Sequence, residues 1–363
     1  MSVRIYIILV IQCLISRIGE AQSDSTGSAS KINYATPGVI NSPRSKFLEV
    51  VYERVGSSNV TSTTRDSEKA LGLPGQLVQE STLRRNNRFI LKAKFPILNK
   101  ETLKIIGGFR YQFEEFQFDT VPNEFRLYNA VFNNLENKHL QSIGGNIYVL
   151  KALNEIHYLG VRVSADVNGD YNYKGKELPL KDYFRTSFSA IYGWKKRPNK
   201  TTGLGFSYTY IFGRQRILPV FIYNHSITKK FGVEAALPAN AKMRYALNPK
   251  TLFYFGYELE GANYQLQFTD PLLLTDKKSL QLRRSVVKLA LEFEREIYDF
   301  FWIGLALGMQ QPVSLNVTDV KTGGLFGGAD HLVRNKLNLA PFANASIFLV
   351  IPRRFDKDIK NTD

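Results

Sequence analysis

Apolar and polar residues alternate along much of the chain, and the pattern is clearest at residues 203–213. In an extended conformation, Leu204, Phe206 and Tyr208 fall on one face, and small residues such as Gly205 fall on the other. Because a β-strand directs successive side chains to opposite faces, this segment is predicted to be a strand with one apolar side and one small, polar side.

The same two-residue period recurs in about 14 segments. The predicted strands are residues 46–55, 88–98, 102–118, 139–151, 157–167, 183–195, 203–213, 217–225, 231–237, 241–248, 251–268, 285–295, 300–310 and 339–350. The strands between residues 217 and 248 are short, so 12 strands is an alternative count. Pro219 falls inside one of these short strands, and a bulge or bend is expected there because proline cannot donate to the ladder.

The connections between these strands tend to alternate between short and long. The short ones are residues 99–100, 154–155, 198–200, 226–230, 248–250 and 296–299, and the long ones are 56–87, 119–138, 169–182, 269–284 and 312–337. Transmembrane barrels have short periplasmic turns and longer outer loops. If the N-terminus lies in the periplasm, every short connection in this series falls on the periplasmic side. Two further connections, near 213–216 and 238–240, fall on the outer side although they are short. They leave the alternation between periplasmic and outer connections unchanged.

A soluble β-sandwich and a secreted β-helix also show such alternation. A sandwich rarely needs so many strands in one domain, and a β-helix would repeat with a fixed short period that this sequence lacks. The mean hydropathy is only −0.20, as expected where lipid-facing and lumen-facing residues alternate. Aromatic residues such as Phe184 and Trp194 lie near predicted strand ends, where barrels carry aromatic girdles. We therefore predict an all-β fold: an antiparallel up-and-down transmembrane β-barrel with short periplasmic turns and long extracellular loops.

The N-terminus has the features of a secretory signal peptide. Arg4 supplies a positive charge, residues 5–15 are apolar, and Gly19 and Ala21 are the small residues expected before a cleavage site. A membrane-anchor helix is the alternative, but this apolar run is too short to span a bilayer.

The chain is accordingly expected to divide into four parts: a signal peptide (1–21), a flexible lead (22–45), the barrel (46–351) and a charged tail (352–363). We expect the protein in the cell outer membrane. Its expected partners there are outer-membrane lipid, including lipopolysaccharide, and the barrel-assembly machinery. The apolar outer face on most strands favours a monomer over a porin-like trimer.

Charge and cysteine content restrict the chemistry further. The formal net charge is +16, yet no Lys/Arg block has the context of a nucleic-acid module, so lipid phosphate is the expected partner and nucleic acid is not. Arg84, Arg85 and Arg88 cluster where the first long loop is predicted to meet the membrane. Cys13 lies within the signal, and the four histidines lack paired spacing, so neither a disulfide nor a metal or other cofactor is expected.

Three segments carry a family resemblance: LPVFIYN at 218–224, KFGVEAALPA at 230–239 and YFGYEL at 254–259. They resemble an uncharacterised family of outer-membrane β-barrel proteins common in the Bacteroidota. The resemblance implies a barrel in the outer membrane, over roughly residues 46–351, and no assigned function. Many such barrels end on an aromatic assembly signal, whereas this chain continues past its last strand, which makes Phe348 the candidate signal.

A pore or transporter for small solutes or hydrophobic molecules is the leading functional hypothesis. The candidate lumen-lining residues are Lys92, Lys94, Arg110, Arg162, Arg185, Lys242, Arg244, Glu258, Glu292 and Glu294. Charged rings set ion preference in wide pores, but the same charges can instead pair across the lumen and fill it. A barrel of 14 strands lies between small filled barrels and open porins, so both arrangements are open.

Two other function classes compete with transport. A non-conducting structural or binding barrel would act through its outer loops, of which 56–87 and 312–337 are the longest. An outer-membrane lipid hydrolase is suggested by Asn224, His225 and Ser226, but neighbours in a strand point apart and would not converge on a substrate. We therefore expect no enzymatic activity.

Overall fold

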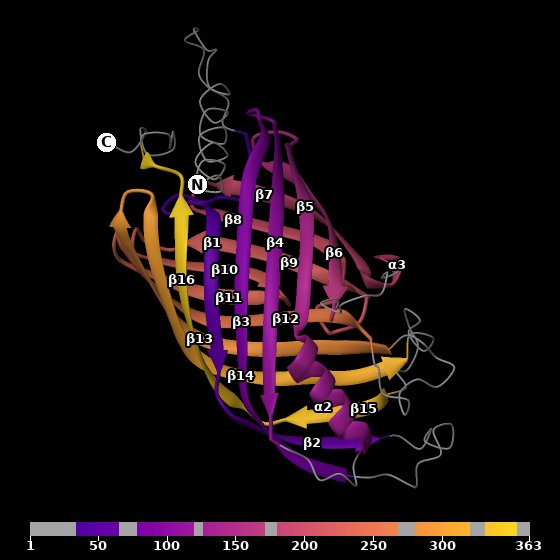
Figure 1. Cartoon of the computed structure of the whole chain (residues 1–363). Coiled ribbons are helices and arrows are strands. Elements are labelled where there is room, and N and C mark those ends of the chain that lie inside the picture. Colours follow the sequence, from indigo (N-terminus) through magenta and orange to yellow (C-terminus); the bar gives the residue numbers. More distant parts are fainter. Residues whose placement is uncertain are drawn as a thin grey trace, which may run out of the picture.

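The computed structural model describes residues 34–64, 78–119, 126–170, 180–267, 280–319 and 331–353. Nearly all of them belong to one antiparallel sheet (Figure 1). The strands are β1 (Lys46–Val55), β2 (Ser58–Thr64), β3 (Val78–Asn99), β4 (Leu103–Phe118), β5 (Leu140–Ala152), β6 (His157–Gly169), β7 (Phe184–Arg197), β8 (Lys200–Thr209), β9 (Arg216–Ser226), β10 (Phe231–Leu237), β11 (Asn240–Asn248), β12 (Thr251–Leu266), β13 (Leu280–Tyr298), β14 (Phe301–Asp319), β15 (His331–Leu337) and β16 (Ala340–Val350). Two helices, α2 (Arg126–Lys138) and α3 (Leu180–Tyr183), lie in the β4–β5 and β6–β7 connections.

The sheet closes into a barrel. From β3 to β14 each strand pairs with the next one in sequence, β14 pairs with β16, and β1 joins β16 to β3. The predicted closed antiparallel barrel of 14 strands is thereby confirmed. The alternative of 12 strands is wrong, because each short segment between residues 217 and 248 pairs on both sides.

The two additional short strands, β2 and β15, extend the first and last barrel strands. β1 and β2 face β3 in one continuous register, as the pairs Leu48↔Ala93 and Ser58↔Leu83 show. β15 and β16 likewise face β2 and β1 in one register. The barrel therefore begins with one strand that is interrupted at residues 56–57 and ends with one that is interrupted at residues 338–339.

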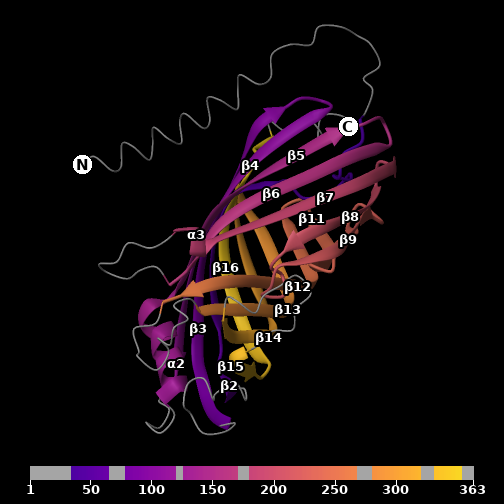
Figure 2. The same ribbon diagram turned by 90° about the vertical axis from the view of Figure 1, so that its right-hand side faces the viewer.

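The two ends of the barrel differ. At one end, the turn end, short hairpins join the strands and β1 begins beside the end of β16 (Figure 1). At the other, the loop end, strands β7 to β11 stop early and the end of β6 meets β12 in a parallel contact, Gly169 with Gln265. Past the ends of β7–β11 the wall consists of β12–β15 and β2–β6, and β5 and β6 themselves end at this contact. We call this narrower part the collar; it lies at the lower left in Figure 2, below β7, β8 and β9.

Large apolar side chains cover the outside of the barrel between the turn end and the collar. Leu204 and Phe206, from the segment with the clearest alternation, are 55% and 46% exposed. Other large apolar residues that alternate along the strands and are exposed include Phe89, Phe109, Ile143, Ile147, Leu159, Val163, Tyr192, Phe255, Leu289, Leu291, Leu305, Leu307 and Ile347. We call this surface the apolar belt.

No helix among the described residues is both long and apolar enough to cross a membrane.

The alternation changes sides in the collar. On β4, Phe109 is exposed on the outer face, whereas Phe116 and Phe118 near the loop end are buried on the inner face. On β13, Leu289 is exposed but Leu282 is buried inside. Apolar residues thus face outward in the belt and inward in the collar, as expected where the surroundings change from lipid to water.

This inversion explains the main errors in the predicted strand limits. Parts of the predicted long loops 56–87, 269–284 and 312–337 are strand, because β2, β3, β13, β14 and β15 continue into the collar. β8 ends at Thr209 rather than 213, since the Gly213 N–H donates to the Tyr210 carbonyl (2.7 Å) and closes a turn.

The bulge expected at Pro219 is absent: Pro219 pairs in register with Phe206 of β8. On its other side, the β9–β10 pairing reaches only as far as Phe221. Pro219 therefore lies on a stretch of free strand edge, where a missing N–H does not interrupt a ladder.

Cysteine labelling tests which face each residue occupies. In the mature chain, which would lack cysteine, bimane on Leu204→Cys should be quenched severalfold more by nitroxide-labelled lipid than bimane on Ser207→Cys. Leu204 is exposed on the belt, and the Ser207 hydroxyl lies 2.8 Å from that of Ser189 on the inner face. Phe206→Cys and Ser189→Cys repeat the comparison on the same faces, and equal quenching at all four positions would contradict the assigned faces.

Candidate functional site

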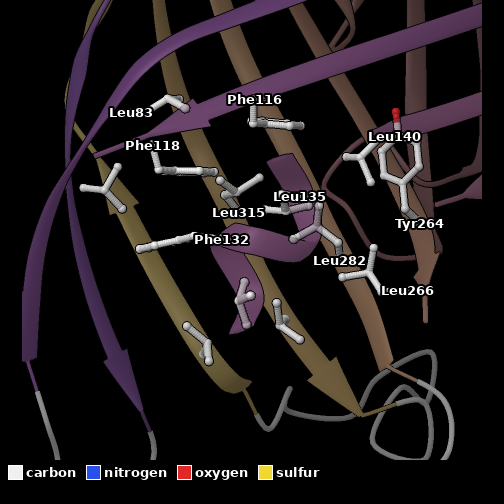
Figure 3. Packing of buried hydrophobic residues seen from close by; sticks show 14 of the residues in the cluster. Leu83, Phe116, Phe118, Phe132, Leu135, Leu140, Tyr264, Leu266, Leu282 and Leu315 are labelled. Atoms are coloured by element: carbon white, nitrogen blue, oxygen red, sulfur yellow. The ribbon is translucent and has the colours of Figure 1, made fainter. Parts of the chain in front are cut away.

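The barrel interior is the candidate site, and an apolar cluster fills its loop end. α2 directs Val131, Phe132 and Leu135 into the collar, where Phe132 stacks on Phe118 with ring centroids 4.3 Å apart (Figure 3). The spacing of these three residues gives the helix one apolar stripe. The cluster, which we call the plug, also contains Val60, Leu83, Phe116, Leu140, Tyr264, Leu266, Leu280, Leu282, Leu315, Val317, Val333 and Leu337.

Polar contacts fix α2 in this position. Asp170, just after β6, accepts hydrogen bonds from the Asn134 amide (3.0 Å) and the Gln267 N–H (2.9 Å). The Lys138 ammonium lies 3.8 Å from the same carboxylate. Burial disfavours the charged form of both groups. It raises the pKa of Asp170, although these neighbours favour the charged carboxylate, and it lowers the pKa of Lys138. The helix is therefore held to the ends of β6 and β12 as well as to the plug.

On the turn-end side of the plug, four charged side chains form a layer across the interior. The Arg88 guanidinium lies 2.6 Å from the Glu260 carboxylate and 3.4 Å from that of Glu53. The Lys288 ammonium lies 2.6 Å from Glu53 and 3.2 Å from Glu260. Arg88 on β3 and Glu260 on β12 belong to strands that are not adjacent, so this contact crosses the lumen. Two cations and two anions neutralise one another, which buried charges require.

A second buried pair widens the layer. The Arg284 guanidinium lies 3.0 Å from the Glu114 carboxylate, which also accepts a hydrogen bond from the Asn86 amide (3.0 Å). The Gln112 amide donates to the Tyr264 hydroxyl (3.2 Å), again between β4 and β12. Together with the first four residues, these side chains form what we call the ionic layer.

A polar chamber of about 130 Å³ lies on the turn-end side of the ionic layer. Its walls come mainly from β1, β12, β13, β14 and β16, with smaller contributions from β3 and β11. The charged residues that line it are Lys46, Glu49, Glu53, Lys92, Lys242, Glu258, Glu260, Lys288, Glu292 and Glu294. Lys242 pairs with Glu292 (2.7 Å) and Lys46 with Glu294 (2.7 Å). The chamber thus presents both signs of charge at close spacing.

Five of the ten lumen-lining candidates from the sequence surround this chamber: Lys92, Lys242, Glu258, Glu292 and Glu294. Three others, Lys94, Arg110 and Arg162, lie on β3, β4 and β6 outside the chamber lining, and the charges of Lys92 and Arg162 both act on Lys94. Within the described ranges, none of the three makes an ion pair shorter than 4.0 Å. The interior therefore has a paired side and a cationic side.

The last two candidates lie at the ends of the barrel. Arg244 is buried near the turn end, 3.1 Å from the Glu234 carboxylate. Arg185 is buried near the loop end, and its Nε donates to the side-chain amide oxygen of Asn263 (2.9 Å). Neither residue lines the chamber.

The prediction that Arg88 lies at a lipid-facing rim is wrong. β3 begins at Val78, which places Arg88 in the middle of the wall and on its inner face, 1% exposed. Arg84 is exposed and pairs with Asp119. The sequence contains a signal for the true position of Arg88. It lies four and six residues before Lys92 and Lys94 on the same strand, and an even separation places all three on one face.

The turn end holds a second apolar cluster and an ordered segment of the N-terminal lead. Phe348 stacks on Trp302 inside the barrel, and the Lys46 ammonium lies 4.0 Å from the Phe348 ring. Residues 34–45, which we call the strap, hydrogen-bond to the turn residues Asn154 and Pro198, 3.1 Å in each case. This part of the lead is not independent of the barrel; residues 22–33 lie outside the described residues.

The strap continues across further turns. The Ser226 hydroxyl donates to the Ile40 carbonyl (2.6 Å), and the Arg44 guanidinium lies 3.1 Å from both Glu296 and Asp299. Because these contacts involve the β9–β10 and β13–β14 turns as well, the strap runs along the rim of the turn end from β5 to β14.

The residues considered for hydrolysis do not converge. Ser226 is buried and bonded to the strap, whereas His225 lies on the other face of β9, with its Nδ1 3.2 Å from the Tyr223 hydroxyl. Across the described part of the chain, no group of three or more His, Cys, Asp or Glu residues is arranged to hold a metal ion.

Removing one carboxylate from the ionic layer should destabilise the barrel. Glu53→Gln leaves Arg88 and Lys288 with Glu260 as their remaining acid, and breaking a buried pair costs about 3–5 kcal/mol. We expect a lower denaturant midpoint for loss of heat-modifiable mobility. Glu115→Gln is the control, since Glu115 makes only a long contact to Asn87 (3.5 Å). Equal midpoints for both variants would show that the layer contributes nothing.

Several solved membrane proteins share some of this architecture at low similarity. An outer membrane channel from Pseudomonas putida F1 is 11% identical, with 90% of this chain and 100% of that chain covered and a TM-score of 0.39. The Pseudomonas putida toluene transporter TodX is 11% identical, with 90% and 95% covered and a TM-score of 0.35. The Escherichia coli outer membrane protease OmpT is 8% identical, with 83% and 96% covered and a TM-score of 0.29.

A search of curated proteins finds no match. A family model described as a domain of unknown function (DUF6268) matches residues 49–349, from β1 to the last strand. The match agrees with the resemblance to an uncharacterised family, and the chain belongs to the DUF6268 family.

Proposed function

We propose that the protein is a gated channel of the outer membrane for small polar solutes, held closed in the conformation described. The observation that carries this proposal is the position of the chamber between two segments that are not barrel strands; for conduction, the ionic layer beside the chamber must open as well. α2 fills the collar on one side, and the strap lies along the turns on the other. Both segments are connections or termini, so either can move without breaking the ladder that closes the wall.

The apolar belt supports a location in the membrane. The ladder closes around the whole barrel, with free strand edge where β9 and β12 continue past the ends of β10 and β11, and the belt offers lipid an apolar surface. The signal peptide expected at residues 1–21 and the short hairpins at the turn end support an outer membrane with this end in the periplasm. The collar and the plug then lie on the extracellular side.

The chamber favours a small polar or zwitterionic solute. The Lys242 ammonium lies 2.7 Å from the Glu292 carboxylate and 3.6 Å from that of Glu258, so a solute that carries both charges finds a partner for each. A hydrophobic passenger would have to cross the ionic layer, where desolvation of the buried charges opposes it. We propose no enzymatic role, since the His225 and Ser226 side chains point to opposite faces of β9.

A non-conducting structural or binding barrel is the second candidate. The specific observation in its favour is the Arg88–Glu260 contact of 2.6 Å across the lumen, which a solute could pass only if it broke. In that case the interior is a packed core that stabilises the barrel, and the outer loops carry the function.

Loosening the plug separates these two functions. In planar bilayers, Phe132→Ser/Leu135→Ser should conduct much more often than wild type, because truncating two buried apolar side chains weakens the packing that holds α2. Asn133→Ser/Asn137→Ser changes two exposed residues of the same helix and is the matched control. Inserted protein that never conducts in either double variant would favour the non-conducting barrel.

The chamber should also set the charge preference of the open channel. Lys242→Glu adds a carboxylate beside Glu258 and Glu292, so the reversal potential in a KCl gradient should shift toward cation selectivity. Lys196→Glu, an exposed position at the turn end, is the control with the same change in net charge. Identical shifts for the two variants would mean that ions do not pass through the chamber.

A further inference from the structure

Four arginines gather outside the lumen of the collar, where the connection between β8 and β9 crosses β12 and β13. Arg185 lies near the start of β7, Arg214 and Arg216 lie in or just after the connection, and Arg283 lies on β13. We call these four residues the arginine cluster. None of them lines the chamber, and the proposed channel does not use them.

The connection packs closely on the outer face of the collar strands. The Ser285 hydroxyl donates to the Ile211 carbonyl (3.0 Å), and the Asn263 amide donates to the Gly213 carbonyl (3.3 Å). Gly213 has a φ of +70°, and a Cβ at this position would lie 3.0 Å from the Arg283 Cβ. Glycine therefore permits both the turn and the close approach, and the connection covers Arg283.

Two of these arginines are buried with unused hydrogen-bond donors. Arg283 is 3% exposed, and its Nε and Nη1 have no hydrogen-bond partner among the described residues. Arg185 is 7% exposed; its Nε donates to Asn263, but its Nη2 has no partner. Asn263 and Arg283 are cross-strand neighbours on β12 and β13, so both sets of unused donors belong to one patch. A buried donor without an acceptor is costly.

The charges around Arg283 are also unfavourable for a buried cation. The charged groups that act on it are the guanidinium groups of Arg214 and Arg216, which are both positive. Burial and the Arg216 charge also lower the pKa of Arg214, which lies in the connection. Other buried arginines of this barrel differ: Arg88 and Arg284 have carboxylates at 2.6 and 3.0 Å.

The surroundings indicate which anion fits. Phe184, next to Arg185, and Ile217, next to Arg216, are 50% and 57% exposed and belong to the edge of the apolar belt. Successive residues of a strand face opposite sides, so these two residues mark the level of the arginine cluster along the barrel rather than its face. That level is where the hydrocarbon of a bilayer would end and lipid phosphates begin. Guanidinium groups bind phosphate through paired, charge-assisted hydrogen bonds.

We propose that the arginine cluster binds a phosphate group, supplied by a phosphorylated lipid of the outer leaflet or by free phosphate. The half-buried Arg214 and the exposed Arg216 make the first contacts, and Arg283 and Arg185 supply donors beneath them. The bound anion offsets the mutual repulsion of the arginines and fixes the β8–β9 connection on the collar. This site does not depend on conduction by the barrel.

The test measures binding by the folded mature chain in a phosphate-free sugar detergent. Diphosphoryl lipid A, the same lipid treated with phosphatase, and inorganic phosphate are titrated separately. We expect removal of the lipid phosphates to weaken binding about tenfold or more, and Arg214→Gln/Arg216→Gln to weaken binding of the intact lipid by about as much. Binding of inorganic phosphate with the same dependence on these arginines would identify free phosphate as a ligand too.

The control is Lys196→Gln/Arg197→Gln, which removes two exposed positive charges at the turn end. It should keep lipid binding within about twofold of wild type, because a remote pair of charges contributes only screened attraction. Arg216→Glu is a second variant at the site, and heat-modifiable mobility verifies that each variant is folded. Equal losses in both double variants, or lipid binding that is insensitive to phosphate removal, would overturn the proposal.

Discussion

The closed hydrogen-bond ladder is the constraint on which the rest of this structure depends. Lipid offers a backbone N–H or C=O no partner, so a spanning sheet must pair every strand on both sides. Here β1 completes the circle by pairing with β16 and with β3. Once the circle is closed, each strand has one face toward the surroundings and one toward a shared interior, and the sequence must satisfy both.

The alternation that reveals the strands also hides their true ends. In the apolar belt, residues such as Leu204 and Leu289 face outward, and their period predicts the strands and their order. In the collar the same period runs with apolar residues such as Phe116 and Leu282 facing inward. The alternation that starts in the belt changes phase here, so the sequence alone predicts loops where strands such as β2, β13 and β15 continue. A strand need not end where its surroundings change.

The interior was partly predictable for the same reason. Parity alone puts residues such as Lys92, Lys242 and Glu292 on one side of the wall, and they lie around the chamber. Which charges meet across the lumen depends on the curvature and stagger of the sheet, which no local pattern records. The pairing of Arg88 with Glu260, far apart in sequence, could not be predicted, and nor could the burial of α2 in the collar, because its apolar stripe finds partners on many strands.

The seam between the first and last strands has a consequence for biogenesis. β1 and β16 are separated by nearly the whole barrel in sequence, yet they share one register that continues through β2 and β15. Contacts of such high sequence separation form late, since the chain entropy lost on closing the loop is recovered only when both partners exist. Until the last strand is available, β1 presents an open edge on one side, and an open edge is a site where other chains can pair. The order of synthesis therefore makes this seam the final joint of the barrel.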